Sequence, residues 1–134
     1  MVDELAEVGV GGEKRWVLAK DLRALKNAQL PEGVRLLPSF DQLLVISAPH
    51  SAAIVDDAFT DKIYRQRIAV WSLPAVLVDG RVQAAWKLER KKNTATARVT
   101  PFKKLTRRTV TALEEEVTKL SEIIGLDTVF ALDA

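Results

Sequence analysis

The chain has 134 residues, of which 48% are hydrophobic, and its net charge is only +2. This length and composition are typical of one globular domain and unlike those of a disordered chain. The absence of cysteine excludes a disulfide framework and a thiolate metal site. The longest apolar runs, such as residues 43–46, are too short to span a membrane, and the first residues, MVDELAEV, lack the apolar core of a signal peptide. We therefore expect a cytoplasmic protein with no membrane partner.

The first 33 residues predict a β-hairpin followed by a short helix. Two apolar, alternating segments within residues 1–18 flank Gly11 and Gly12, which supply the positive φ that a tight turn needs. Residues 20–30 place two leucines three positions apart, as on one face of a helix. Pro31 and Gly33 then end that helix.

Residues 34–46 are apolar and β-prone, and they predict two strands, 34–37 and 43–46, that are separated by a break at Pro38. Residues 47–66 give weaker signals. Ser51 is a candidate cap for one helical turn, and Asp57 or Thr60 for a second.

Residues 75–99 predict a three-stranded antiparallel meander. Asp79 and Gly80 form a strong hairpin signal between residues 75–78 and 81–87. After this turn, apolar residues from Val82 to Leu88 alternate with polar ones, which predicts one dry face and one wet face. Four alanines in these strands favour close packing, as inside a barrel.

The segment 106–124 is the clearest helix, because apolar residues recur at intervals of three and four from Val110 to Ile124. Thr106 is the expected N-cap and Gly125 the expected left-handed C-cap. Residues 128–132 predict a final strand.

Positive charge is concentrated between residues 81 and 108. Ten basic residues and one acid, Glu89, give this segment a charge of +9, so the other 106 residues carry −7. Such asymmetry is typical of contact with nucleic acid, although a solvated face without a partner would look the same. The candidate contacts, which we expect on one continuous surface, are Arg81, Lys87, Arg90, Lys91, Lys92, Arg98, Lys103, Lys104, Arg107 and Arg108.

Three segments carry a family resemblance: RLLPSFDQLL (35–44), LPAVLVDGRVQAAWKLER (73–90) and VTPFKKL (99–105), followed by the amphipathic helix. In this order they resemble the C-terminal portion of the bacterial winged-helix DNA-binding family, which includes glycosylases that unhook interstrand crosslinks. The resemblance implies a β-barrel-like module that follows winged-helix repeats in a longer protein and helps to hold DNA.

The resemblance does not extend to catalysis. The glycosylases of that family place catalytic glutamines in a Gln-x-Gln-type motif, whereas Gln29, Gln42, Gln66 and Gln83 are scattered here. Where relatives carry an arginine-rich stretch after the FD segment, this chain has ISAPHSAA at residues 46–53.

Three other residues could have a functional role, but each also has a simpler structural interpretation. His50 is the only histidine and lies in a Ser/Ala/Pro loop without evident catalytic partners. Asp41 suits either a structural hydrogen bond or a carboxylate site. Trp86 alternates with apolar residues and suits the core, although an exposed tryptophan stacks on bases. No phosphate-binding glycine loop or zinc spacing occurs, so we expect no metal and no cofactor.

Together these observations predict an α+β fold: an antiparallel β-meander or partly closed β-barrel with a C-terminal amphipathic helix, preceded by a hairpin–helix remnant of a winged helix. Residues 1–33 would form the remnant and residues 34–134 the barrel-like domain. The function that fits is a non-catalytic module that binds the phosphates of duplex or branched DNA. The alternatives are a support domain of a DNA glycosylase whose catalytic residues lie outside this chain, and a protein- or small-ligand-binding barrel.

Overall fold

The computed structural model describes residues 4–47, 52–64 and 72–134. The chain forms two compact units, Met1–Leu30 and Pro31–Ala134. No helix within the described ranges is long and apolar enough to cross a membrane.

The first unit is a β-hairpin with a short helix. Strands β1 (Leu5–Val10) and β2 (Glu13–Leu18) pair antiparallel, and the glycine turn between them has the expected positive φ values of 60° and 83°. A 3₁₀ turn (Ala19–Asp21) leads into helix α1 (Leu22–Lys26), which is shorter than predicted. The hairpin and the helix are thus confirmed, whereas their assignment as a winged-helix remnant stays a prediction.

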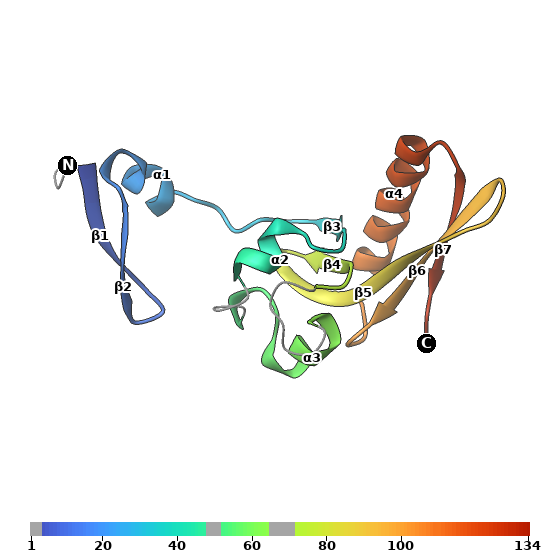
Figure 1. Cartoon of the computed structure of the whole chain (residues 1–134), viewed down its shortest axis with the longest axis horizontal. Coiled ribbons are helices and arrows are strands. Elements are labelled where there is room, and N and C mark those ends of the chain that lie inside the picture. Colours follow the sequence, from blue (N-terminus) through green and yellow to red (C-terminus); the bar gives the residue numbers. More distant parts are fainter. Residues whose placement is uncertain (1–3, 48–51, 65–71) are drawn as a thin grey trace. The chain divides into compact units, whose positions relative to one another are not determined.

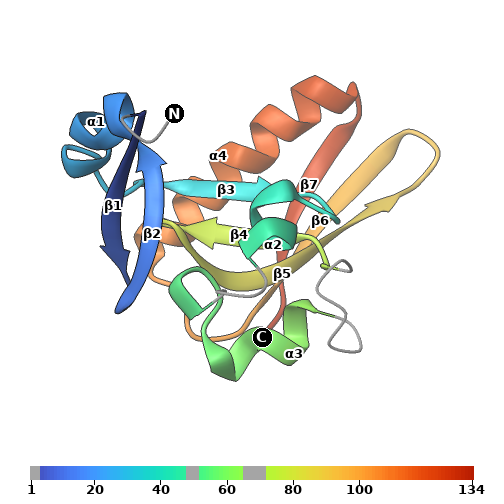
Figure 2. The same ribbon diagram turned by 60° about the vertical axis from the view of Figure 1, so that its left-hand side comes forward.

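The second unit is built on a curled five-stranded sheet, a half-barrel, that Figures 1 and 2 show from two sides. Its strands follow one another in chain order: β3 (Val34–Leu37), β4 (Ala75–Val78), β5 (Arg81–Arg90), β6 (Thr94–Pro101) and β7 (Asp127–Leu132). The first four are antiparallel, which confirms the predicted meander, and β7 runs parallel to β6.

Helices cover both faces of the inner strand β4, all four residues of which are buried. On one face, Val76 and Val78 pack in a cluster with Leu113 of helix α4 (Arg107–Ile124). Successive side chains of a strand point to opposite faces. Ala75 and Leu77 accordingly join a second cluster with residues of helices α2 (Gln42–Ser47) and α3 (Thr60–Ile63).

A β-bulge breaks the predicted alternation at the start of β5. Leu77 pairs with Val82 and Val76 with Ala84, so that Gln83 is an extra residue. Val82 therefore packs in the cluster with α2 and α3, whereas Ala84 packs in the cluster with α4. Period-two alternation predicted that Val82 and Ala84 lie on the same buried face of the sheet. This prediction is wrong for Val82.

The strand predicted at residues 43–46 is also wrong, because these residues lie in helix α2. The Asp41 carboxylate accepts a hydrogen bond from the Leu43 N–H at 2.9 Å, and its carbonyl accepts from Leu44 and Val45 at 3.0 Å each. This local capping starts a helical turn that buries Leu44 completely. A four-residue apolar run cannot by itself distinguish a strand from a buried helical turn. These bonds give Asp41 a structural role, which was one of the two alternatives expected from the sequence.

The helical turns after residue 56 are capped by a neighbouring residue rather than by the predicted Asp57 or Thr60. Asp56 caps the 3₁₀ turn Asp57–Phe59 by accepting from the Ala58 N–H at 3.0 Å, and α3 follows directly. The candidate cap Ser51 and the lone His50 lie outside the described residues.

Helix α4 begins and ends as predicted. The Thr106 hydroxyl accepts from the Thr109 N–H at 3.2 Å, and Gly125 has the left-handed φ of 65°. Trp86 is half-buried beside this helix, and its indole N–H donates to the Leu37 carbonyl at 2.8 Å. This bond and packing support the core interpretation of Trp86.

Candidate nucleic-acid interface

The structure places the basic residues of 81–108 in groups along the β5–β6 strand pair. The β5–β6 hairpin places the end of β5 at one end of this strand pair, and the β6–α4 connection lies at the other end. Residues close in sequence are therefore carried apart along β6, and the expectation of one continuous surface stays a prediction.

The first group lies at the tip of the long β5–β6 hairpin, which extends to the upper right in Figure 1. It consists of Arg90, Lys91 and Lys92, and we call it the tip group. All three side chains are exposed, and none has an ion pair or side-chain hydrogen bond in the described structure. Their charge is thus available to a partner.

The second group lies where β6 leads into α4, and we call it the helix-start group. It consists of Lys103, Lys104, Arg107 and Arg108, all exposed and equally without a described side-chain partner. Arg107 and Arg108 line a shallow surface pocket with Glu115, which offsets part of their charge. Cations at a helix N-terminus oppose the helix dipole, so these arginines do not stabilise α4.

Lys62 adds a cation near this second group that the sequence did not indicate. The Phe59 and Phe102 rings are in contact, with centroids 5.1 Å apart, and Lys62 Nζ lies 5.2 Å from the Phe102 centroid. Phe102 directly precedes Lys103, so Lys62 reaches the same end of the sheet from helix α3. No local pattern could reveal this proximity, because it depends on packing between distant segments.

Arg81 lies at this same end of β5, but its guanidinium is already engaged. It donates to the Ala52 carbonyl at 3.1 Å. Arg81 thus helps to hold the segment that precedes α3 against the β4–β5 turn.

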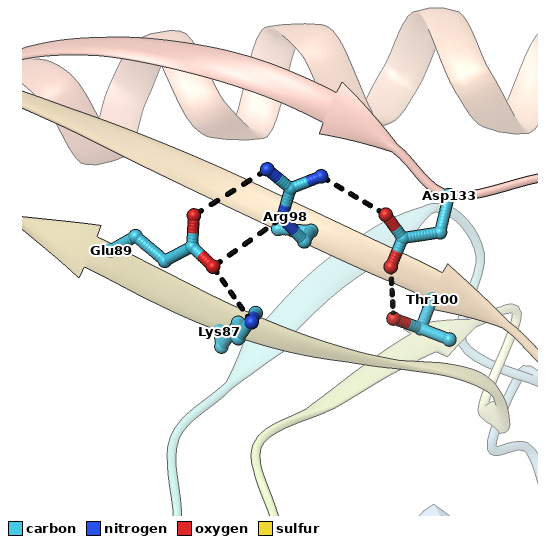
Figure 3. A network of polar contacts seen from close by, with 5 residues as sticks. All are labelled: Lys87, Glu89, Arg98, Thr100 and Asp133. Carbon is cyan, nitrogen blue, oxygen red and sulfur yellow. Dashed lines mark hydrogen bonds and ion pairs between the residues drawn. The ribbon is translucent and has the colours of Figure 1, made fainter.

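Lys87 and Arg98 are register partners on β5 and β6, and both are neutralised within a polar network (Figure 3). Lys87 Nζ lies 2.7 Å from Glu89 Oε1, and Arg98 reaches the same oxygen at 3.4 Å. Arg98 also donates to Asp133 at 3.1 Å. Of the ten predicted contacts, these two are therefore the least suited to bind an external anion.

The network lowers the pKa values of both carboxyl groups. Hydrogen bonds from Lys87 and then from Arg98 lower the pKa of Glu89. A bond from the Thr100 hydroxyl at 2.6 Å, followed by the bond from Arg98, lowers the pKa of Asp133. The same bonds, first from Asp133 and then from Glu89, raise the pKa of Arg98. Asp133 follows β7, so the network ties the end of the chain to β6.

These shifts predict how acid affects stability. A carboxyl group with a lowered folded-state pKa stabilises the fold above its unfolded pKa of about 4, and this contribution is lost as the pH falls through the folded value. The double variant E89Q/D133N should therefore be less stable than the wild type above pH 5 and lose less stability between pH 5 and pH 3. Urea denaturation at these pH values measures the difference.

The control for this experiment is E114Q/E122Q, which changes the net charge equally at exposed carboxyl groups of α4. This control should keep the wild-type dependence on pH. Identical pH profiles for E89Q/D133N and the wild type would contradict the role given to the network.

The polar chemistry of the described residues suits the binding of an anion. No cluster of three or more histidine or carboxylate side chains in the described ranges is arranged to hold a metal ion. Seven exposed cations without side-chain partners, at the β5–β6 turn and at the β6–α4 junction, can form charge-assisted hydrogen bonds with phosphate oxygens.

Comparison with known proteins relates the chain to DNA glycosylases. The family model described as "DNA glycosylase AlkZ-like" matches residues 1–123. The chain is 32% identical over 126 residues to an interstrand DNA cross-link repair glycosylase of Streptomyces sahachiroi, covering 94% of this chain and 32% of that protein. The solved structure of the DNA glycosylase AlkZ from the same organism superposes with a TM-score of 0.76 at 30% identity, over 98% of this chain and 34% of that one.

These matches confirm the resemblance to crosslink-repair glycosylases, although they do not test the wider winged-helix assignment. The chain spans about a third of the length of the relatives that it matches. It belongs to the AlkZ-like DNA glycosylase family.

Proposed function

We propose that this chain is a DNA-binding support module of an AlkZ-like glycosylase, which holds the phosphate backbone and leaves base removal to residues outside the chain. The observation that carries the proposal is the set of seven exposed, unpaired cations in the tip and helix-start groups. Membership in a DNA glycosylase family makes DNA the natural anionic partner.

The geometry favours backbone contact over base reading. The cations lie at the β5–β6 turn and at the β6–α4 junction, and lysine and arginine side chains in such positions neutralise phosphates without regard to sequence. The tip and helix-start groups therefore predict binding with little sequence preference.

A ligand-binding barrel is the weaker alternative. The face of the sheet that α4 covers is filled by buried side chains, including Ala84, Val99 and Leu113. This packing uses the interior that a small ligand would need.

The proposal is tested by titrating the chain with duplex, single-stranded and forked DNA at two salt concentrations. Binding should occur with unrelated duplex sequences alike and should weaken strongly at the higher salt concentration, because each phosphate contact releases counterions. Duplex binding that is absent at low salt, or that does not respond to salt, would contradict the proposal.

The isolated chain should release no base from alkylated or crosslinked DNA. The Gln-x-Gln motif implied by the family resemblance is missing from the sequence, and the described residues offer no metal cluster in its place. Base release is measured against a protein-free blank and against an active glycosylase on the same substrate. Release above the blank by the purified 134-residue chain would show that it carries chemistry of its own.

A further inference from the structure

The tip and helix-start groups lie at opposite ends of one strand. Strand β6 has eight residues, Thr94–Pro101, and it begins next to the tip group and ends next to the helix-start group. At about 3.3 Å per residue, the seven steps along this strand separate the two groups by about 23 Å.

The sheet surface between the groups carries no net charge. On the face opposite α4, the cations Lys87 and Arg98 are matched by the carboxylates Glu89 and Asp133. This face has Arg98, whereas its neighbours Ala97 and Val99 are buried on the α4 side. An anion that crosses this middle stretch meets neither strong attraction nor strong repulsion.

Helix α4 beyond its first turn is unsuited to DNA. Helix α4 displays Glu114, Glu115 and Glu122 as exposed carboxylates. A polyanion is therefore directed away from these carboxylates, to the tip group and to the helix-start group, which precedes and begins α4.

The two groups act independently in the electrostatic sense. At physiological ionic strength the Debye length is about 8 Å, so charges about 23 Å apart hardly influence each other. Each group must therefore contact its own phosphates. One duplex can contact both groups only if it is long enough to span the distance between them.

Resting on the function proposed above, we infer that the chain grips duplex DNA at two separate phosphate sites, about seven base-pair steps apart. Base pairs of B-DNA rise about 3.4 Å each along the axis, so about 23 Å along the duplex corresponds to that number of steps. A duplex shorter than this engages one group at a time, whereas a longer duplex engages both in one complex. The second contact is then intramolecular, which raises the overall affinity without any new contact.

Duplex length is the variable that tests the inference. The probes are a 16-base-pair duplex and a 6-base-pair duplex closed at one end by a non-nucleotide linker. The 6-base-pair duplex covers only about 17 Å between its terminal base pairs, less than the separation of the groups. Affinity is measured by fluorescence anisotropy over a salt series for the wild type, K91A/K92A and K103A/K104A.

On the long duplex, each double variant should lose at least about tenfold in affinity at 50 mM salt, and its salt slope should flatten by about 2. On the short duplex, each variant should lose at most about twofold, because the remaining group still binds it. A variant that carries all four substitutions should lose binding to both duplexes. The charge-conserving control K91R/K92R should behave like the wild type on both.

Failure of the inference and failure of the proposed function give different results. If K91A/K92A and K103A/K104A reduce the affinity for the short duplex as much as for the long one, both groups contact the same phosphates. The two-site inference is then overturned. If the wild type binds neither duplex at 50 mM salt, the proposed DNA-binding function itself fails. Unchanged circular dichroism spectra show that the variants are folded, as expected for exposed loop lysines.

Discussion

Leu113→Ala should lower the free energy of unfolding of the second unit by about 3 kcal/mol, within the range of about 2–5 kcal/mol for such truncations. Leu113 is completely buried, and it lies in the cluster that joins α4 to the sheet through Val34, Val76 and Val99. The loss combines the transfer free energy of the removed methyl groups with the cavity that they leave. Both residues are good helix formers, so helix propensity does not account for the effect.

Ile123→Ala is the matched control, because it shortens an aliphatic side chain of the same helix that is 81% exposed. This variant should change stability by less than about 0.5 kcal/mol. Urea denaturation followed by circular dichroism at 222 nm measures both variants. Equal effects of the two substitutions would contradict the packing of α4 on the sheet, which also fixes where the helix-start group lies.

The elements that could be predicted from the sequence are those with local signals. Asp79 and Gly80 adopt positive φ values of 49° and 81° in the β4–β5 turn, as a two-residue hairpin requires. Thr106 and Gly125 bound α4 as their cap chemistry indicates. In these places the conformation depends on the residues themselves and on their nearest neighbours.

The elements that could not be predicted depend on competition or on distant contacts. The apolar run after Asp41 is β-prone, but the side-chain and backbone oxygens of Asp41 favour a helical turn. The bulge at Gln83 cannot be recognised in the alternation of apolar and polar residues along β5. It is visible only in the structure, where Val82 and Ala84 pack in different clusters.

The candidate interface shows the same limit. Sequence counting finds one dense basic segment, but a strand of eight residues carries its members to two separate places. Counting also cannot show that Glu89 and Asp133 neutralise Lys87 and Arg98. Only the unpaired cations at the two ends remain as candidates, with the exposed Lys62 of α3 as an addition.

The largest effect that we expect on function is the salt dependence of duplex binding. If four or five of the unpaired cations neutralise phosphates, the logarithm of the binding constant should fall with the logarithm of salt concentration at a slope of about −4. Affinity should then drop about 250-fold between 50 and 200 mM salt. A contact driven by an apolar pocket would instead show little salt dependence and greater sensitivity to Trp86→Ala than to any lysine.

The central claim is that unpaired cations, and not paired ones, bind DNA phosphates, and one comparison of salt slopes tests it most directly. K91A/K92A removes two exposed cations without side-chain partners, whereas K87A removes a cation that Glu89 already neutralises. The slope on a long duplex should flatten by about 2 for K91A/K92A, equally for unrelated sequences, and should stay near the wild-type value for K87A. An unchanged affinity and slope in K91A/K92A would contradict the account, because the basic hairpin tip would then be only a solvated surface.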